Sequence, residues 1–431
     1  MRFLAAGDLH MGAGAKGLPD ALAGQYSGIA TWRLLVREAV ARQVEAVLLL
    51  GDVVDWGNRF FEALGPLTEG ISALREQKIR VFAVAGNHDA EALGSIARVA
   101  QLENFALLGR GGQWEWRILP SDAGPPVQLF GWSFPERHYA LNPFASFPRD
   151  DVDSACIGLG LLHADRDSAG SRYAPVHASD FLATGVGHWV LGHIHKPDAL
   201  PGGGAVYTGS PSGMDASETG LHGALLLELG SHPPSYQRVP LSGLRYEQVA
   251  LELGEVANVG DVQTHLVERA RAWAAPLIAE QPGVEHLVLS GCCRALTRVS
   301  EKTLYDEGLQ NLLQGKEPLP LADGRQLWFM GVTLDFAPPV IPEELAREEG
   351  ILGQTARLIL SLQAPAERAL PEDIQALLRR AGQRDKETAA RGIFRDLPQE
   401  ATASPADARA VLLRQAWRLL AELHARREVQ P

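Results

Sequence analysis

The first half of the chain predicts an α/β fold in which two sheets stack on each other. Short apolar runs alternate there with segments of helical periodicity, and several of these runs end directly at an Asp, Asn or His residue. Continuously apolar strands are typical of sheets that are covered on both faces. The rest of the chain predicts a smaller α+β unit followed by helices alone. At 431 residues, the chain is long enough for two or three domains.

Five apolar runs of the first half are predicted strands that stop at a polar motif. In chain order they are 3–7, 46–50, 81–85, 157–162 and 189–191. Residues 24–43 have helical spacing and fit a connecting helix. Short strands and glycines between 105 and 130 predict hairpins of a second sheet stacked on the first, and 206–207 and 224–229 are expected to complete it. We expect this N-terminal domain to span residues 1–235.

Two further parts follow this domain. Residues 241–340 mix strand and helix patterns, so we expect a smaller α+β domain there. Residues 341–431 have helical patterns only, around 343–362, 371–381 and 405–428. The last of these helices carries an apolar stripe of Leu412, Ala416, Leu419 and Leu423, with Leu413, Trp417 and Leu420 beside it. Such a stripe packs either on the chain's own core or on a partner protein, and we leave both readings open.

Five short motifs of Asp, Asn and His follow the predicted strands. They are Asp8-Leu9-His10, Gly51-Asp52, Gly86-Asn87-His88-Asp89, His163 and Gly192-His193-Ile194-His195. Ligands at the carboxyl ends of such strands meet at one edge of a sheet. Carboxylate, imidazole and amide ligands together suit two divalent metal ions held side by side. Each motif alone is commonly structural, but the ordered set predicts a metal-dependent phosphoester hydrolase.

Asp52 is the expected bridge between the two ions, because it follows a buried strand and a glycine that permits a tight turn. One metal site would be completed by Asp8, His10 and His195, and the other by Asn87, His163 and His193. A water molecule shared by both ions would be acidified until hydroxide forms near neutral pH. That hydroxide would attack phosphorus in line while the ions neutralise the growing charge.

The leaving oxygen needs a proton or a positive charge nearby. His88 is adjacent to a predicted ligand but is not needed as one, so we assign this role to His88. Asp89 could fix the tautomer of His88 through a hydrogen bond. Asp55 could steer substrate or cap the following segment, and we interpret it as structural.

Bulk composition narrows the class of protein. Hydrophobic residues make up 46% and charged residues 21% of the chain, as in soluble globular proteins. No apolar run is long enough to cross a bilayer. A cleaved leader would remove the first motif, so a cytoplasmic location is expected. The net charge of −12 does not favour unaided, tight binding of nucleic acid, although it does not exclude cleavage of a phosphodiester.

The motifs resemble those of the calcineurin-like metallophosphoesterases, and most closely the SbcD and YhaO-type branch of the double-strand-break repair nucleases. The similarity continues between the motifs. It includes Leu129-Phe130-Gly131-Trp132-Ser133-Phe134-Pro135, Tyr173-Ala174-Pro175, Tyr207-Thr208-Gly209-Ser210-Pro211 and Glu218-Thr219-Gly220. It covers residues 1–229 well, 241–340 in outline, and the helical tail weakly.

This resemblance implies a four-layer α/β/β/α catalytic domain and an α+β capping domain that helps to seat DNA. It implies the metal ligands named above, with His88 as the transition-state histidine, and manganese as the metal, with magnesium or another transition metal as alternatives. It also implies 3′-to-5′ exonuclease and single-strand endonuclease activity in DNA repair, in the cytoplasm and on the nucleoid. The helical segment would dock on the coiled coil of an SMC-like ABC-type ATPase, which could supply much of the grip on DNA. Members of the family often form homodimers.

Two other functions compete with this one. The first is a phosphodiesterase or phosphatase for cyclic nucleotides or another small phosphoester, and the long segment after residue 235 argues against it. The second is a non-catalytic adaptor of an ATPase complex. The intact set of predicted metal ligands argues against an adaptor, because such a cluster of charge is costly without a task.

Overall fold

The computed structural model describes residues 1–55, 60–100, 102–121, 124–168, 170–200, 204–230, 234–299, 301–337, 342–363, 372, 374–376, 380 and 405–429. The chain divides into two compact units. The first comprises Met1–Gln248, Pro276–Ser290 and Pro320–Met330, and the second Val249–Ala275, Gly291–Leu319 and Gly331–Pro431. The three domain ranges expected from the sequence remain a prediction.

A six-stranded sheet with the order β13-β12-β1-β2-β3-β4 forms the centre of the first unit. Its strands are β1 (Arg2–Ala6), β2 (Ala46–Leu50), β3 (Arg80–Val84), β4 (Phe105–Leu107), β12 (Ala224–Glu228) and β13 (Ser235–Val239). Strands β1 to β4 pair in parallel, whereas β12 pairs antiparallel with β1 and β13. All five residues of β2 are buried, as the apolar runs predict for a sheet covered on both faces.

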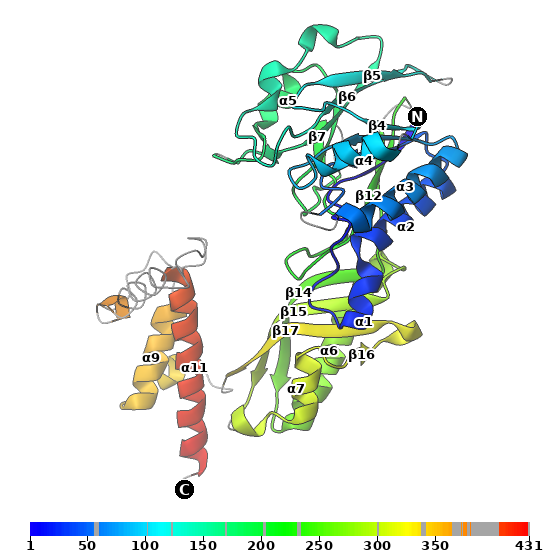
Figure 1. Ribbon diagram of the computed structural model, residues 1–431. Helices are drawn as coiled ribbons and strands as arrows, with labels where there is room; N and C mark the ends of the chain where they lie inside the picture. The colour runs from blue at the N-terminus through cyan, green and yellow to red at the C-terminus, as the bar shows by residue number, and fades with distance from the viewer. Residues whose placement is uncertain are drawn as a thin grey trace. The chain divides into compact units, whose positions relative to one another are not determined.

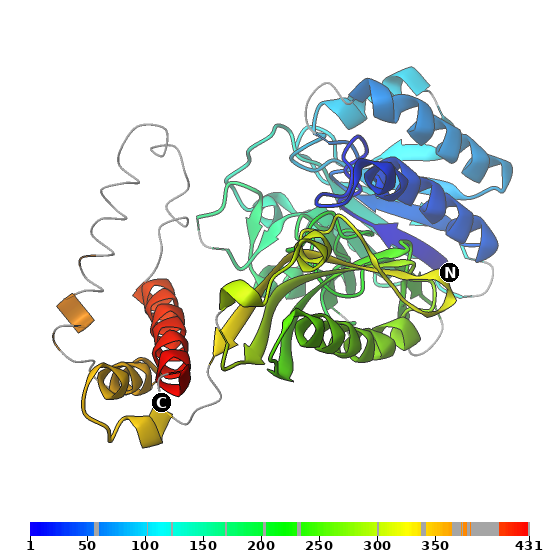
Figure 2. The same ribbon diagram turned by 90° about the horizontal axis from the view of Figure 1, so that it is seen from below.

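Helices cover one face of this sheet. They are α2 (Gly28–Ala41), α3 (Phe60–Glu76) and α4 (Ala92–Ala100), preceded by the short α1 (Asp20–Ala23) and η1 (Gly24–Tyr26). Ser27 caps α2 by accepting a hydrogen bond from the backbone of Ala30 at 3.3 Å. Trp32 and Leu35 of α2 are fully buried against the sheet. Helices α2 and α3 lie side by side (Figures 1 and 2).

A five-stranded sheet with the order β11-β10-β7-β6-β5 packs on the opposite face of the first sheet. Its strands are β5 (Glu115–Leu119), β6 (Val127–Trp132), β7 (Ile157–His163), β10 (His188–Gly192) and β11 (Gly204–Tyr207), and all pairs except β5–β6 are parallel. The interface between the sheets is a continuous apolar core that includes Phe3, Leu48 and Leu161.

The outer face of the second sheet completes a four-layer arrangement. It is covered by α5 (Ala178–Leu182), by η2 (Pro143–Ser146) and η3 (Arg149–Asp151), and by loops that contain the two-stranded pair β8 (Asp165–Arg166) and β9 (Pro175–Val176). Buried aromatic residues fill this layer, with Phe144 and Phe181 packed edge-on around Trp189. The α/β/β/α sandwich expected from the sequence is therefore confirmed.

One strand assignment from the sequence is wrong. Residues 224–229 were expected to complete the second sheet, but β12 pairs with β1 in the first sheet. The side chains of β12 agree with this position, because Leu226 faces the helix layer while Leu225 and Leu227 face the second sheet. A strand that is apolar at every position suits either sheet, since both are covered on two faces, so the apolar pattern alone could not assign β12 to one of them.

A third sheet with the order β14-β15-β17-β16 follows in the chain. Its strands are β14 (Leu244–Glu255), β15 (His286–Leu296), β16 (Leu319–Pro320) and β17 (Gln326–Ala337), and the intervening helices are α6 (Val259–Glu280), η4 (Glu301–Thr303), α7 (Glu307–Leu313) and η5 (Ala322–Gly324). Strand β14 alternates between buried and exposed residues, which is typical of a sheet with one solvated face.

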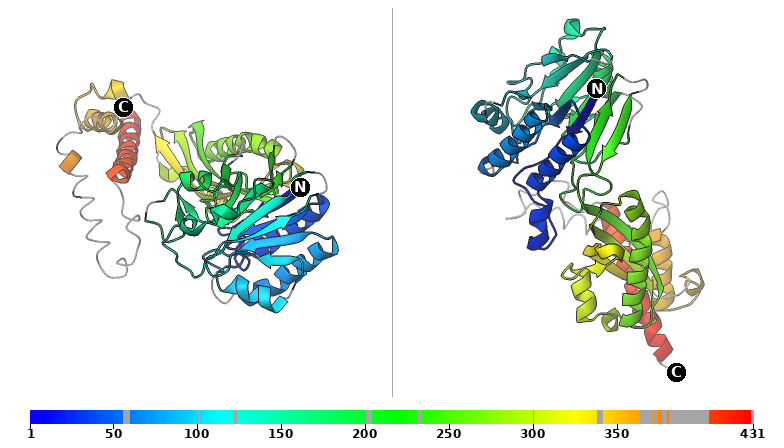
Figure 3. Two further views of the ribbon diagram at one scale, coloured as in Figure 1. Left: turned by 90° about the horizontal axis from the view of Figure 1, so that it is seen from above. Right: turned by 90° about the vertical axis from the view of Figure 1, so that its right-hand side faces the viewer.

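The last helices are α8 (Pro342–Leu345), α9 (Ile351–Gln363) and α11 (Pro405–Val429). Helices α9 and α11 lie side by side in every view (Figures 1, 2 and 3). Their shared core contains Ile359 from α9 and Trp417 and Leu420 from α11, whereas Leu419 is 46% exposed. The buried face of α11 is therefore rotated away from part of the predicted stripe. Most of the predicted helix at 371–381 lies outside the described residues.

In the described part of the chain, no helix combines the length and the apolar character needed to span a membrane.

Candidate metal centre

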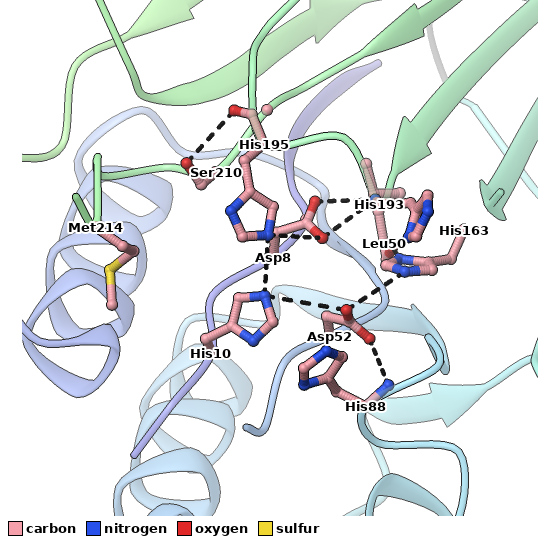
Figure 4. A network of polar contacts seen from close by, with 12 residues as sticks. Asp8, His10, Leu50, Asp52, His88, His163, His193, His195, Ser210 and Met214 are labelled. Atoms are coloured by element: carbon pink, nitrogen blue, oxygen red, sulfur yellow. Dashed lines mark hydrogen bonds and ion pairs between the residues drawn. The ribbon is translucent and has the colours of Figure 1, made fainter. Parts of the chain in front are cut away.

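The polar motifs converge at the carboxyl ends of strands from both stacked sheets. Asp8 and His10 follow β1, Asp52 follows β2, Asn87 follows β3, His163 ends β7, and His193 and His195 follow β10. Figure 4 shows the carboxylates and imidazoles pointing toward one another. The sequence predicted a single sheet edge, but two of the five motifs come from the second sheet. The edges of the two sheets coincide because the sheets stack with these strand ends on the same side.

Backbone hydrogen bonds hold the loops of the cluster together. The amide of Asp8 donates to the carbonyl of Gly51 at 3.0 Å, and the amide of His193 donates to the Asp8 carboxylate at 3.0 and 3.1 Å. The amide of His88 donates to Asp52 Oδ1 at 2.9 Å. The first and second sheets are thus joined at the site itself.

One group of donor atoms consists of Asp8, His10 and His195. Each offers one ligand atom, and the three atoms lie within 4.8 Å of one another. The Nε2 atoms of His10 and His195 are only 3.1 Å apart, and His195 Nε2 lies 3.9 Å from Asp8 Oδ1. Two imidazole nitrogens that face each other this closely suit a shared cation, since metal–nitrogen bonds of about 2.0–2.1 Å place neighbouring ligands at similar separations.

A second group consists of Asp8, Asp52 and His163, again with ligand atoms within 4.8 Å of one another. His163 Nε2 is 3.0 Å from Asn87 Oδ1 and 3.5 Å from Asp52 Oδ2. The ring of His193 packs edge-on against that of His163, with centroids 5.1 Å apart. All residues predicted for the second metal site therefore lie together.

Asp52 belongs to the second group and also lies near the first. Its Oδ2 atom is 3.5 Å from His163 Nε2 on one side and 3.9 Å from His10 Nε2 on the other. Asp52 is therefore close to an imidazole of each group, as expected of a bridging carboxylate, while Asp8 is a member of both groups. The assignment of individual ligands to each ion remains a prediction.

Three of the imidazoles share one pattern of contacts. Their Nδ1 atoms face an oxygen on the opposite side of the ring from Nε2, which is Glu218 Oε1 at 2.7 Å for His195, the Leu50 carbonyl at 2.9 Å for His163, and Asp55 Oδ1 at 3.4 Å for His10. In its neutral form, an imidazole whose Nδ1–H faces such an acceptor presents the lone pair of Nε2 to the cluster. The donor set therefore fits divalent cations. Sequence reasoning missed Glu218, which lies 23 residues from its partner and outside the metal motifs.

The charges of the cluster are mutually dependent. Burial favours the neutral form of Asp52, but the neighbouring imidazoles of His163 and His10 outweigh burial and hold the pKa of Asp52 well below its usual range. Burial raises the pKa of Asp8, and the negative charge of Asp52 raises it further. Positively charged imidazoles thus compensate the charge of two buried carboxylates in the metal-free chain. A pair of bound cations would take over this compensation.

The histidines divide into two classes. Burial lowers the pKa of His163 and of His195, but Asp52 beside the first and Glu218 beside the second reverse this, and both pKa values rise to about 9. Burial and the nearby His163 lower the pKa of His193 to about 3. Binding of a cation to His163 and His195 must therefore displace protons.

His88 lies at the edge of the cluster with a side chain that is 32% exposed, so it can reach a substrate. We expected Asp89 to hold this imidazole. The carboxylate oxygen near His88 Nδ1 instead belongs to Asp55, at 3.4 Å, and this oxygen lies at the same distance from His10 Nδ1. The Asp55 carboxylate raises the pKa of His88 above its usual value. Asp55 therefore contacts two histidines of the site, which its interpretation as a purely structural residue did not anticipate.

Asp89 ties the backbone of two loops together. Its carboxylate accepts hydrogen bonds from Gly86 at 2.7 Å and from Val53 and Val54 at 2.6 and 3.3 Å. It is completely buried, and burial beside Asp52 raises its pKa to about 6 despite these three donors. Asp89 thereby holds the loop after β2 against the loop after β3.

Several residues of the cluster adopt the left-handed backbone conformation that L-residues usually avoid. The φ angles are 56° for Asp8, 43° for His10, 49° for Asp52 and 99° for His193. This conformation is unfavourable by roughly 1–2 kcal/mol for most residues, and it persists only where the surrounding structure imposes it. The donor atoms are therefore held in place by the fold before any ligand arrives.

Comparison with known proteins identifies the class to which this arrangement corresponds. Residues 1–197 match the family described as calcineurin-like phosphoesterase. Residues 1–197 therefore form a calcineurin-like metallophosphoesterase domain, a class of phosphoester hydrolase. The family expected from the sequence is thus confirmed.

Three relatives make the comparison more specific. The chain is 26% identical over 322 residues to the uncharacterized metallophosphoesterase YhaO of Bacillus subtilis. This alignment covers 72% of this chain and 77% of the relative. It is 26% identical to the D subunit of the nuclease SbcCD from Rhodobacter capsulatus, over 47% of this chain and 62% of the relative. It is 24% identical to the DNA double-strand break repair protein Mre11 of Methanopyrus kandleri, over 49% of each chain.

Proposed function

We propose that this chain is the nuclease subunit of a DNA repair complex that hydrolyses phosphodiester bonds with two divalent cations. The observation that carries the proposal is the convergence of two overlapping groups of donor atoms, with Asp52 close to an imidazole of each. The choice of DNA as substrate draws on the names of two relatives, a nuclease subunit and a DNA break repair protein.

The residues of the site would divide the work as follows. Two divalent cations, when bound, lower the pKa of a water molecule toward neutrality and offset negative charge on phosphoryl oxygens. Asp52, with the donors on either side of it, would fix the spacing of these charges. His88 would protonate the leaving oxygen of the nucleic acid, because it is partly exposed and lies beside the ligands. Asp55 would stabilise the imidazolium form of His88 before that transfer.

Manganese is the proposed metal. The donors combine carboxylate, amide oxygen and imidazole, which suits a divalent ion that accepts both oxygen and nitrogen ligands. Magnesium prefers oxygen ligands and retains its water, so we expect it to support less activity.

This chain would bind DNA together with a partner protein. The chain has a net charge of −12, which does not favour a long-range attraction to DNA. We propose that a coiled-coil ABC-type ATPase supplies much of the grip and that the α9–α11 pair docks on it. Leu419 and Val411 of α11, which are 46% and 50% exposed, are available for such a contact. We further propose that the complex acts in the cytoplasm on the nucleoid, and that the chain can form homodimers.

The first experiment tests the activity. The purified chain is mixed with Mn²⁺ and linear double-stranded DNA, with and without its ATPase, and a cyclic nucleotide is offered in parallel. We expect DNA degradation that disappears on chelation and on His88→Ala substitution. Intact DNA under all conditions would refute the nuclease assignment, and rapid hydrolysis of the cyclic nucleotide alone would replace it with a small-phosphoester enzyme.

The second experiment tests the docking surface. Deletion of residues 405–431 would also expose the core of α9, so a surface substitution is the better probe. Leu419→Glu should abolish co-purification with the ATPase while hydrolysis of a short oligonucleotide is retained. Gln415→Glu, at another exposed position of the same helix, is the matched control for added charge. Equal co-purification of both variants would argue against this surface.

A further inference from the structure

The Nδ1 side of the His195 ring contacts a segment that contains none of the metal motifs. Glu218 Oε1 lies 2.7 Å from Nδ1 of His195, and the Glu218 side chain is only 10% exposed. The Nε2 atom on the opposite side of the same ring faces His10 and Asp8. The imidazole of His195 is thus fixed between a carboxylate behind it and the metal cluster in front of it.

Glu218 is itself fixed through its second oxygen. Oε2 accepts hydrogen bonds from Ser210 Oγ at 2.8 Å and from the amide of Met214 at 3.1 Å. Ser210 is completely buried, and its amide donates to the carbonyl of His195 at 2.8 Å. Figure 4 shows Ser210 beside this carbonyl. The segment from 210 to 218 therefore holds both the backbone and the ring of His195.

A further buried residue supports the same segment. His222 is 6% exposed, and its Nδ1 atom is 2.8 Å from the carbonyl of Ser210, to which it donates in the Nδ1–H tautomer. Its Nε2 atom has no hydrogen-bond partner among the described residues. With its carbonyl occupied by His222 and its amide by His195, the backbone of Ser210 has little freedom to move.

We propose that Glu218 is a positioning residue of the metal centre. Its carboxylate keeps the proton of His195 on Nδ1, and the lone pair of Nε2 is thereby directed at the cation. Without this acceptor, the proton can reside on Nε2, and the ring can turn away from the cluster. The proposal rests on the dimetal site of the proposed function, and it adds a residue that none of the metal motifs contains.

The test uses Glu218→Gln in the full chain, because this variant keeps the shape of the side chain and removes its charge. Binding of Mn²⁺ to the metal-free protein is measured by isothermal titration calorimetry. We expect affinity at one of two sites to fall roughly 10–100-fold, as for other partners of metal-binding histidines. Asp215→Asn is the matched control, because Asp215 lies in the same segment and its carboxylate accepts from Ser217 rather than from an imidazole. Its affinity should stay close to that of the unaltered chain.

A second measurement reads the proton directly. Long-range ¹H–¹⁵N spectra of the metal-free protein labelled at histidine report which ring nitrogen carries hydrogen. The spectra are recorded above pH 9, where the ring of His195 is neutral. We expect the Nδ1–H form of His195 in the unaltered chain and a shift toward the Nε2–H form in Glu218→Gln. Ser210→Ala, which removes one donor to Glu218, should shift both readouts in the same direction by a smaller amount, and it serves if Glu218→Gln does not fold.

The outcomes separate this proposal from the proposed function. Unchanged Mn²⁺ affinity and an unchanged His195 tautomer in Glu218→Gln would overturn the role of Glu218. Equal losses in Glu218→Gln and Asp215→Asn would overturn it as well, because bulk charge would then explain the effect. If the unaltered chain binds no Mn²⁺, the dimetal function fails, whereas the tautomer of His195 still decides whether Glu218 orients the ring.

Discussion

Gly51 allows us to predict how tightly the metal centre is packed. It precedes Asp52 and has a φ angle of +86°. A Cβ atom at this position would lie 2.5 Å from His163 Nδ1 and 2.8 Å from the amide nitrogen of Gly86. Both distances are shorter than any ordinary contact, so Gly51→Ala must displace His163 or the loop after β3.

The size of the effect follows from two independent terms. An alanine in the left-handed region is unfavourable by roughly 1–2 kcal/mol. Overpacking of a rigid interior adds about 1–3 kcal/mol. We therefore expect Gly51→Ala to lower the free energy of unfolding by about 2–5 kcal/mol. Because the displaced atoms belong to a predicted ligand and its loop, affinity for Mn²⁺ should fall as well.

Gly111→Ala is the control, because Gly111 has a similar φ angle of +73° and a methyl group placed there would meet no atom within 4 Å. Gly111→Ala should lower the free energy of unfolding only by the backbone contribution of roughly 1–2 kcal/mol. Its affinity for Mn²⁺ should be normal. Stability is measured by urea denaturation of the metal-free protein, and affinity by calorimetry. If the two variants are equally stable and bind Mn²⁺ equally well, the close packing around His163 is refuted.

Further predictions concern catalysis, pH and the helical pair. His88→Ala should lower turnover on DNA by roughly 10²–10⁴-fold and leave Mn²⁺ affinity unchanged in calorimetry; a parallel loss of affinity would make His88 a ligand. His163 and His195 have pKa values of about 9 against an ordinary 6.5, so the folded metal-free chain binds more protons than the unfolded chain between these values. Its melting temperature should therefore fall as pH rises from 6.5 to 9, and a rise would contradict the assigned shifts. Leu420→Ala should destabilise the α9–α11 pair by about 2–5 kcal/mol, and Leu419→Ala much less, since Leu420 is fully buried and Leu419 is 46% exposed. Hydrogen exchange of the α9 amides measures both effects. Equal acceleration of exchange in the two variants would contradict this packing.

The sequence carried most of the information about the first unit. Strands such as β2 are apolar at every position and end at a polar motif, so both their burial and their end could be predicted. The membership of a strand in one sheet or the other could not, as residues 224–229 illustrate, because both sheets offer cover on two faces. On α11, periodicity located the apolar residues, but the choice between Leu419 and Leu420 as the buried one depends on the position of α9.

The candidate site shows a similar division. The predicted ligands could be found because each follows a strand end, and parallel strands bring such ends together. The partners of these ligands could not be found in the same way. Glu218 and Asp55 approach His195 and His10 only after loops from distant segments have folded, and a carboxylate in a loop has many commoner roles. Adjacency in sequence was misleading for Asp89, whose oxygens face backbone amides and not the ring of His88.

The left-handed backbone at Asp8 and Asp52 restricts which amino acids can serve there, independently of their chemistry. Glutamate offers the same carboxylate, but its longer side chain lacks the local hydrogen bonding that helps aspartate to tolerate this conformation. An exchange of Asp for Glu would therefore be penalised twice, once by the misplaced oxygen and once by the main chain. Other amino acids at positions 8 and 52 are disfavoured by the backbone conformation as well as by the requirement for a metal ligand. Substitutions in these loops should therefore be tolerated better at neighbouring positions.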